Sequence, residues 1–247
     1  MDINDIAKVI DEFYQDFSIK KTLQYVQSAK TTLPIIWFGN LEKYFSSNIK
    51  ILTIGLNPSL REFDEERFPG VANGFELQNY SSVFDGLNKY FTYNPYKAWF
   101  SAYERVLSCS NWDATYGGKI TKNAWAKNYA IHIDYFSAIA TNPTWSRLDN
   151  IAKLKLQRID LFDKLFEFLN PDIVLFSTSE DEICGHFKLL RTNPLGASLP
   201  TSTQNYIREH SYRDNNGKDI LFIWGKANVK PFQGVRTDLL RTYFKFR

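Results

Sequence analysis

Apolar residues along the chain fall into two kinds of pattern, and the order in which the patterns alternate predicts the fold class. Short unbroken runs rich in β-branched residues are typical of buried strands. Three such runs occupy 50–55, 128–134 and 172–177. Apolar positions at helical spacing predict helices over 80–91, 96–107, 151–169 and 180–190. Because strands that alternate with helices usually pair in parallel, these segments predict an α/β fold with a mainly parallel sheet.

The two ends of the chain also follow helical spacing. We expect an N-terminal helical segment over about 1–45 and a terminal amphipathic helix over 233–246. An Asn-Asn-Gly turn at 215–217 is typical of a hairpin. Strands are expected on each side of it, near 206–212 and 219–224. Together these segments predict a single three-layer α/β/α domain over residues 1–247, with the mainly parallel sheet in its centre.

Composition and charge narrow the class of protein. The chain is 44% hydrophobic and 16% aromatic, as in a globular domain. No apolar run approaches a membrane span, and the first residues are acidic where a secretory signal is basic, so we expect a cytoplasmic protein with no membrane partner. Cys109 and Cys184 lack a CxxC partner, which argues against a disulfide framework and a structural zinc site. The net charge of +3 alone does not indicate that the protein binds nucleic acid.

The first strand ends at the most informative segment, Gly55-Leu56-Asn57-Pro58-Ser59. Because proline restricts the residue before it to an extended backbone, the Asn57 carboxamide is aimed in one direction just beyond the strand. Such a carboxamide is suited to holding a water molecule. An Asn-Pro pair is also an ordinary turn dipeptide, and this reading stays open.

This segment resembles the first motif of the uracil-DNA glycosylase superfamily, a strand that ends in Gly-x-(Asp/Asn)-Pro. The Asn form is typical of its mismatch-specific and thymine-type members. In the mismatch-specific branch a Pro-Gly or similar turn and then Asn-x-Phe follow, and Pro69-Gly70 and Asn73-Gly74-Phe75 recur here in that order. Phe75 could equally be a core phenylalanine. The resemblance spans roughly 51–232. It implies a uracil-DNA-glycosylase-like fold, a catalytic Asn57, and base contacts from Leu56 and Phe75, with the Phe75 ring stacked on the extruded base.

Two residues depart from the uracil-specific pattern. Many superfamily members have an asparagine where Asp134 ends the second strand, and the strict uracil-specific family has a bulky tyrosine where Ser59 stands. An ionised carboxylate accepts hydrogen bonds, so it suits the N4 amino group of cytosine better than the O4 atom of uracil. A serine leaves space beside C5 of the base. Asp134 could equally be a structural carboxylate, and His132, on the same strand face, receives no firm role.

The third superfamily motif follows the last strand, where this chain has the segment 225–232. Asn228 is a second catalytic candidate that could donate to the departing base. Lys226 and Lys230 are candidates for contacts with DNA phosphates, as is Arg147 in the loop after the second strand. A lysine-bearing surface loop is the alternative reading of the segment.

The resemblance therefore implies a monofunctional DNA glycosylase that leaves an abasic site, with DNA as its partner. We expect no metal, no cofactor and no obligate protein partner. Asp134 and Ser59 favour a C5-modified cytosine, such as the glucosylated hydroxymethylcytosine of some phages. The alternatives are a uracil or mismatch repair glycosylase and a catalytically silent nucleic-acid-binding member. An unrelated α/β protein that binds a phosphorylated ligand would lack support, because the chain has no GxGxxG or P-loop motif.

Overall fold

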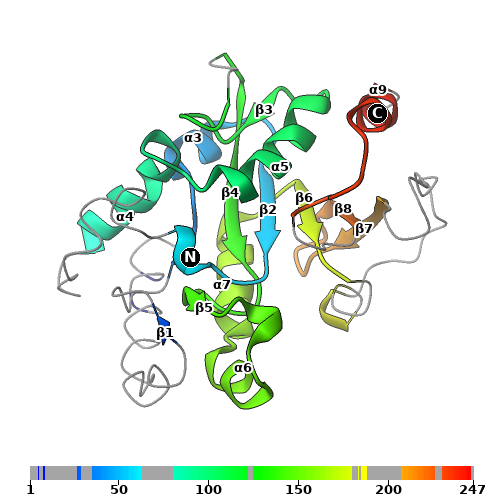
Figure 1. The fold of residues 1–247 in the computed structure, drawn as a ribbon. Coiled ribbons are helices and arrows are strands. Elements are labelled where there is room, and N and C mark those ends of the chain that lie inside the picture. The colour runs from blue at the N-terminus through cyan, green and yellow to red at the C-terminus, as the bar shows by residue number, and fades with distance from the viewer. Residues whose placement is uncertain are drawn as a thin grey trace. The chain divides into compact units, whose positions relative to one another are not determined.

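The computed structural model describes residues 35–62, 80–121, 125–179, 207–225 and 230–245, and also positions 5, 8, 27–28, 183 and 185–187. Its centre is a six-stranded sheet in the order β3-β4-β2-β6-β8-β7 (Figure 1). These strands are β2 (Ile51–Gly55), β3 (Ala114–Thr115), β4 (Asn128–Asp134), β6 (Ile173–Ser177), β7 (Arg208–Arg213) and β8 (Asp219–Gly225).

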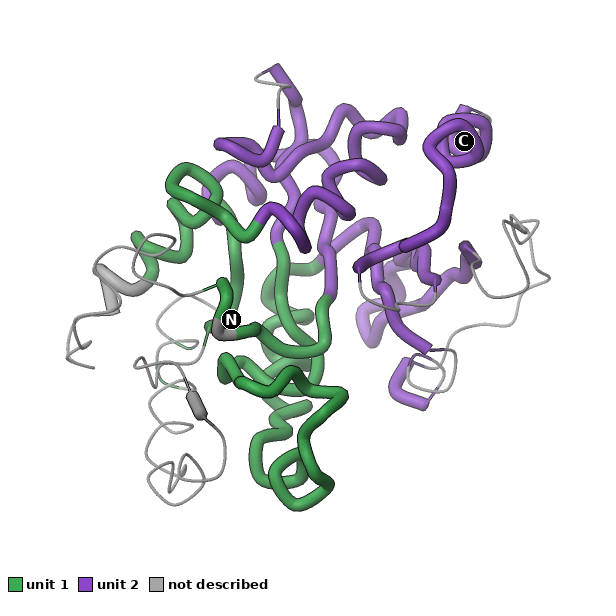
Figure 2. Tube along the Cα trace, in the orientation of Figure 1, with its two compact units in different colours: residues 1–40, 55–96, 132–170 green, residues 41–54, 97–131, 171–247 purple. Residues whose placement is uncertain are grey.

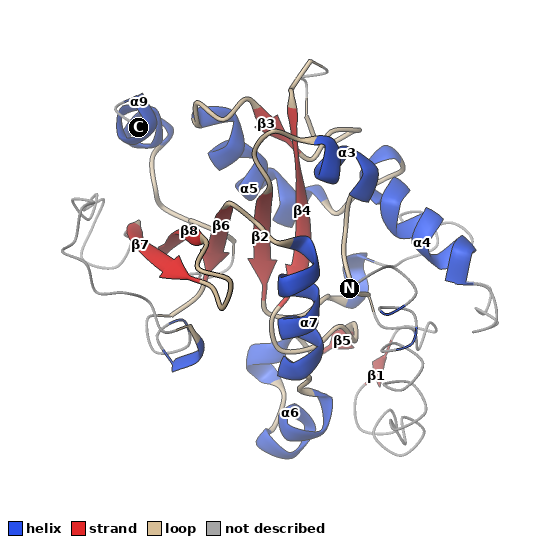
Figure 3. Ribbon diagram, turned by 180° about the vertical axis from the view of Figure 1, so that it is seen from behind, coloured by secondary structure: helices blue, strands red, loops and turns tan. Residues whose placement is uncertain are grey.

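The sheet is mainly parallel. β3 pairs with β4 in parallel, and β6 pairs in parallel with β2 on one side and with β8 on the other. β7 runs antiparallel to β8 and forms one side of the sheet (Figure 3). Every residue of β2 and β6 is buried, as expected for parallel strands that are covered on both faces and have nearly continuous apolar sequences.

Helices flank this sheet, which confirms the α/β class that the alternating pattern predicts. The α-helices are α3 (Leu41–Ser46), α4 (Tyr80–Lys89), α5 (Lys97–Cys109), α6 (Asn150–Leu156), α7 (Ile159–Leu169) and α9 (Thr237–Lys245). Short 3-10 helices are η1 (Leu60–Glu62), η2 (Tyr90–Thr92) and η3 (Trp145–Arg147), and β1 (Gln27–Ser28) pairs antiparallel with β5 (Thr141–Asn142). None of the described helices has the length and apolarity needed to cross a membrane.

The strands expected over 50–55, 128–134 and 172–177 are confirmed, as are the helices expected over 80–91 and 96–107. The predicted hairpin is also present. In its turn, Gly217 has a φ of 82°, a value that only glycine adopts without strain. The N-terminal helical segment and the helix expected over 180–190 lie largely outside the described residues.

The single helix predicted over 151–169 is wrong, because the chain forms two helices there, α6 and α7. Gln157 is extended, with φ −68° and ψ 129°, and the N–H of Arg158 donates to Phe136 O at 2.8 Å instead of continuing the helix. The break also changes the phase of the apolar stripe, since the buried residues Leu156 and Leu161 are five positions apart. A continuous helix would place residues with this spacing on different faces.

The terminal helix also begins later than predicted, at Thr237 instead of residue 233. Residues 231–234 form turns, and Gly234 has a φ of 81°, which is outside the helical region. Val235 is buried and thus extends the apolar pattern upstream of the helix without being helical. Burial alone does not distinguish a helix from the turn that precedes it.

The chain divides into two compact units, each assembled from separate segments (Figure 2). Unit 1 comprises 1–40, 55–96 and 132–170, and unit 2 comprises 41–54, 97–131 and 171–247. The last residue of β2 and the last three residues of β4 belong to unit 1. The carboxyl ends of these two neighbouring strands therefore lie in one unit, and ligands of open α/β sheets bind at such strand ends.

Candidate active site

The loop after β2 stays beside the end of β4. The carbonyl of Gly55 accepts a hydrogen bond from Tyr135 N at 3.0 Å, and the carbonyl of Leu56 accepts one from Phe136 N at 2.9 Å. All four residues belong to unit 1. The Leu56 side chain is half-buried, and its contact with a base stays a prediction. The backbone pairing holds the start of the Gly55-Leu56-Asn57-Pro58 motif against the strand that ends in Asp134.

The carboxamide of Asn57 is fixed by protein groups at both of its ends. Its Nδ2 donates to Thr141 Oγ1 at 2.7 Å and to Pro58 O at 3.0 Å. Its Oδ1 accepts from Trp145 N at 3.3 Å. Because a carboxamide oxygen has two lone pairs, Oδ1 can still accept a hydrogen bond from a water molecule. Asn57 is thus anchored to Pro58, Thr141 and Trp145, which the sequence did not predict. These hydrogen bonds also fix the direction of the remaining lone pair of Oδ1.

Ser59 and Glu62 form one half of a capping box at the start of η1. The Ser59 N–H donates to Glu62 Oε1 at 3.1 Å, and the Glu62 N–H donates to Ser59 O at 3.0 Å. In a complete capping box the serine hydroxyl would also accept a hydrogen bond from the backbone. Here Ser59 Oγ is buried and has no hydrogen-bond partner. The loop therefore presents a buried hydroxyl whose hydrogen-bonding capacity is unused.

Asp134 is crowded against His132 and Gly55. A Cβ atom at position 55 would lie 2.3 Å from Asp134 Oδ1 and 2.9 Å from His132 Nε2, so only glycine fits there. Asp134 is 9% exposed, and its Oδ2 atom is buried without a hydrogen-bond partner. The other carboxylate oxygen, Oδ1, lies 3.8 Å from His132 Nε2, which is too far for a hydrogen bond.

Three titratable groups lie in this part of the site, Glu62, His132 and Asp134, and burial favours the neutral form of each. Burial, and then the charge of Asp134, raises the pKa of Glu62 from 4.5 to about 8, against the opposing effect of the Ser59 N–H and of the nearby Ser59 hydroxyl. Burial also raises the pKa of Asp134 well above its ordinary value. Burial lowers the pKa of His132 to about 3. His132 is therefore neutral near neutral pH, and its contact with Asp134 is not an ion pair.

An apolar cluster includes Trp145, the residue whose backbone N–H contacts Asn57. It contains Ile139, Trp145, Leu148, Ala152 and Leu156. The Trp145 ring stacks on Phe136, with ring centroids 5.0 Å apart and an interplanar angle of 8°. Because the backbone N–H of Trp145 also holds Asn57 Oδ1, the packing of this side chain determines where the carboxamide lies.

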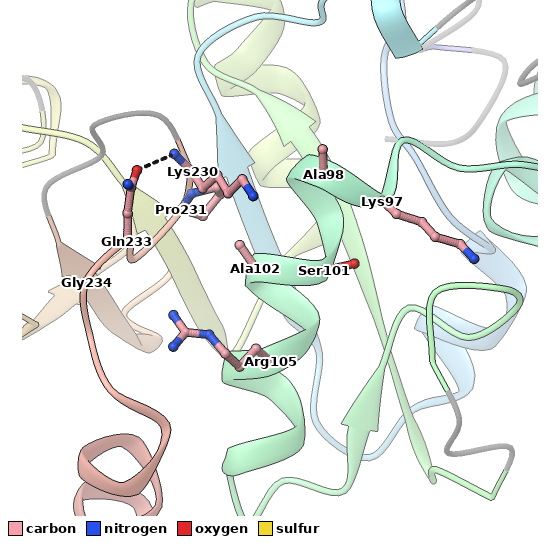
Figure 4. Close-up of a pocket in the computed structure, with 9 residues that line it drawn as sticks. All are labelled: Lys97, Ala98, Ser101, Ala102, Arg105, Lys230, Pro231, Gln233 and Gly234. Atoms are coloured by element: carbon pink, nitrogen blue, oxygen red, sulfur yellow. Dashed lines mark hydrogen bonds between the residues drawn. The ribbon is translucent and has the colours of Figure 1, made fainter.

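The two described candidates for phosphate contacts lie in different units. Arg147 is exposed in η3 of unit 1. Lys230, in unit 2, lines a pocket of about 310 Å³ between α5 and the turn at 230–234 (Figure 4). Lys97 and Arg105 also line it, but the Lys97 side chain points away from that turn in Figure 4, and the Arg105 guanidinium donates to Phe232 O at 3.0 Å. The lining of this pocket therefore includes three cationic residues.

Phe75, Lys226 and Asn228 lie outside the described residues, so their expected roles stay predictions. Of the other site residues expected from the sequence, the structure brings Leu56, Asn57, Ser59 and Asp134 together in unit 1. Sequence reasoning missed Glu62 and Thr141. The Ser-x-x-Glu spacing of a capping box was a readable signal for Glu62. No signal indicated that Thr141 would contact Asn57.

Among the residues that the structure describes, no three His, Cys, Asp or Glu side chains gather in a way that could hold a metal ion. The comparisons with known proteins do not place the chain in a family. No model of a known protein family matches the chain, and no curated protein matches its sequence.

Proposed function

We propose that the protein is a cytoplasmic DNA glycosylase that hydrolyses the N-glycosidic bond of a flipped-out, C5-modified cytosine. Glucosylated hydroxymethylcytosine in phage DNA is the favoured substrate. The observation that carries the proposal is a pair of buried atoms without hydrogen-bond partners, Ser59 Oγ and Asp134 Oδ2, in the same unit as Asn57. Buried polar atoms in proteins normally have partners, and the polar edge of a bound base would supply them.

The chemistry of these two side chains favours cytosine. A carboxyl group at Asp134 can accept a hydrogen bond from the N4 amino group, which uracil lacks. Ser59 is small, so a substituent on C5 of the base would meet a hydroxyl instead of an aromatic ring. The hydroxyl can also form a hydrogen bond with a polar substituent such as a sugar.

Asn57 would position the water molecule that attacks the sugar. Its Nδ2 is held by Thr141 and Pro58, so its orientation is fixed before substrate binds. An amide has almost no basicity, and the reaction therefore depends on positioning and on stabilising the charge of the departing base. The products are the free base and an abasic site.

A repair glycosylase acting on uracil is the second candidate, and one observation favours it. Burial raises the pKa of Asp134 well above its ordinary value and so favours the protonated form of its carboxyl group. A protonated carboxyl can donate a hydrogen bond to the O4 atom of uracil. The two candidates differ in substrate and share the site.

The test is the formation of abasic sites in duplexes that contain one uracil, one unmodified cytosine or one glucosylated hydroxymethylcytosine. Wild-type protein is compared with Asn57→Ala and with Asn150→Ala, a matched change at an exposed position at the start of α6. Release of the modified cytosine alone, lost in Asn57→Ala and kept in Asn150→Ala, is the expected result.

The other outcomes separate the alternatives. Release of uracil would show that the protein acts on a repair substrate instead of the modified cytosine. Binding of DNA without release of any base would leave a catalytically silent nucleic-acid-binding protein. Release that is unchanged in Asn57→Ala would remove Asn57 from the mechanism.

A further inference from the structure

Glu62 and Asp134 are two buried carboxyl groups to which the described residues supply no cationic partner. Glu62 is 6% exposed, and its described polar contact is the hydrogen bond that Oε1 accepts from Ser59 N. Asp134 Oδ2 has no hydrogen bond. In the part of the chain that the structure describes, neither carboxyl group forms an ion pair with a lysine or an arginine. The neighbouring titratable group, His132, is 1% exposed.

Two carboxyl groups in this environment cannot both be ionised at low cost. Each buried charge needs compensation, and the second charge repels the first. His132 does not compensate them, because burial lowers its pKa to about 3. The raised pKa values of both carboxyl groups follow from this arrangement. The pair therefore keeps at least one proton at neutral pH, since the pKa of Glu62 is raised to about 8.

We infer that Glu62 and Asp134 share this proton and that Asp134 delivers it to ring nitrogen N3 of the cytosine that leaves. The inference rests on the proposed glycosylase activity. Asp134 is the donor because its unpartnered Oδ2 belongs to the residue expected to face the pairing edge of the base. On that edge, N3 accepts a hydrogen bond and the N4 amino group donates one. A protonated carboxyl group matches both.

The proton of Asp134 moves to N3, and the bond between C1′ of the sugar and N1 of the base breaks with its electron pair going to the base. The base then leaves as a neutral molecule instead of an anion. Water adds to C1′ and loses one proton, which restores the protonated carboxyl pair. Protonation of the leaving group lowers the barrier because it removes the negative charge that would otherwise develop.

Asp134 is the catalytic residue in this step, because it contacts the base. Glu62 is a positioning residue that acts through Asp134. Its negative charge, when present, keeps the last proton on the pair, and its hydrogen bond with the Ser59 N–H fixes its place. A purely structural Glu62 would not affect the pH at which Asp134 loses its proton.

The shared proton is tested on the free protein by NMR titration of the side-chain carboxyl carbons. We expect one titration step of the pair to lie above neutral pH in wild-type protein and to move to lower pH in Glu62→Gln. Glu167→Gln, a matched change at an exposed position of α7, is expected to leave that step unchanged. Titration of both carboxyl groups near their ordinary values would overturn the inference, whether or not the protein excises a base.

Delivery of the proton is tested by single-turnover excision as a function of pH. The rate on the modified cytosine is expected to fall about tenfold per pH unit once the pair is deprotonated, and Glu62→Gln is expected to shift this fall to lower pH. A 3-deaza analogue, with carbon in place of N3, should not show the fall. A rate independent of pH, or the same pH dependence with the analogue, would overturn the delivery step. Absence of excision from every substrate would refute the proposed function and the delivery step, while the NMR titration would still decide whether the proton is shared.

Discussion

Replacement of Gly55 by alanine tests the crowding between β2 and β4 directly. The new methyl group would lie 2.3 Å from Asp134 Oδ1 and 2.9 Å from His132 Nε2. Cβ atoms in proteins essentially never lie within 3.0 Å of a heavy atom of a residue that is not their neighbour in the chain. Both neighbouring side chains are buried, so neither can swing into solvent. We expect the free energy of unfolding to fall by about 1–3 kcal/mol, the usual cost of overpacking a core. The melting temperature should fall by about 2–4 °C for each kcal/mol lost.

Urea and thermal unfolding of Gly55→Ala measure this cost, and the chain offers a matched control. A Cβ atom at Gly185, which is helical, would meet no atom within 4 Å. Gly185→Ala is therefore expected to be neutral or to stabilise the protein by up to about 1 kcal/mol, because alanine favours a helix. The contrast separates steric crowding from the general effect of changing glycine to alanine.

A double-mutant cycle identifies the atoms responsible. In an Asp134→Ala background the 2.3 Å contact is absent, and only the contact of 2.9 Å with His132 remains. Gly55→Ala should then cost less than it does in the wild-type background, with a coupling energy of about 0.5–3 kcal/mol. A Gly55→Ala protein as stable as wild type, or the same cost in both backgrounds, would refute the reasoning.

Three further predictions follow from the same site and from its expected DNA contacts. Because burial and the charge of Asp134 raise the pKa of Glu62 from 4.5 to about 8, the folded protein keeps a proton that the unfolded chain releases between these values. Glu62 alone should thus lower the free energy of unfolding by at most about 1.4 kcal/mol per pH unit as pH rises through this interval, and Glu62→Gln should reduce the slope in urea titrations. Asn57→Ala should cost about 1–3 kcal/mol in the same assay, because the Trp145 N–H loses its acceptor; an unchanged stability would show that this hydrogen bond is unimportant. Lys230→Ala and Arg147→Ala should each reduce the salt dependence of DNA binding by about one counterion in fluorescence anisotropy, and an unchanged slope would remove that residue from the interface.

β2, β4 and β6 were predictable because most of their residues are buried, whereas the two-residue strand β3 was not predicted. β2 and β6 are nearly continuous apolar runs, and the sequence marks the strand ends with polar residues or turns. The break between α6 and α7 was not predictable. It depends on the hydrogen bond from Arg158 N to Phe136 O, and no local pattern shows a contact between residues so far apart in the sequence.

The sequence also predicted correctly where two of the candidate residues lie in the fold. Asn57 and Asp134 were expected at the carboxyl ends of two strands, and those strands are neighbours in the sheet. The environment of each side chain was not predictable. Thr141 and Trp145 hold Asn57, and Glu62 adds a second buried carboxyl group to the site. These relations depend on how distant segments pack, whereas strand ends depend on local sequence.

Among the described strands, the two outer ones, β3 and β7, limit pairing with other chains in different ways. An unpaired strand offers a row of backbone N–H and C=O groups, which is a template for aggregation. At one side β3 has two residues, so it offers little length for an added strand. At the other side β7 is six residues long, but its sequence, Arg-Glu-His-Ser-Tyr-Arg, carries charge along its length. We expect short length to limit strand addition at β3 and charge to limit it at β7, and removal of the β7 charges would make the chain more prone to form intermolecular sheets.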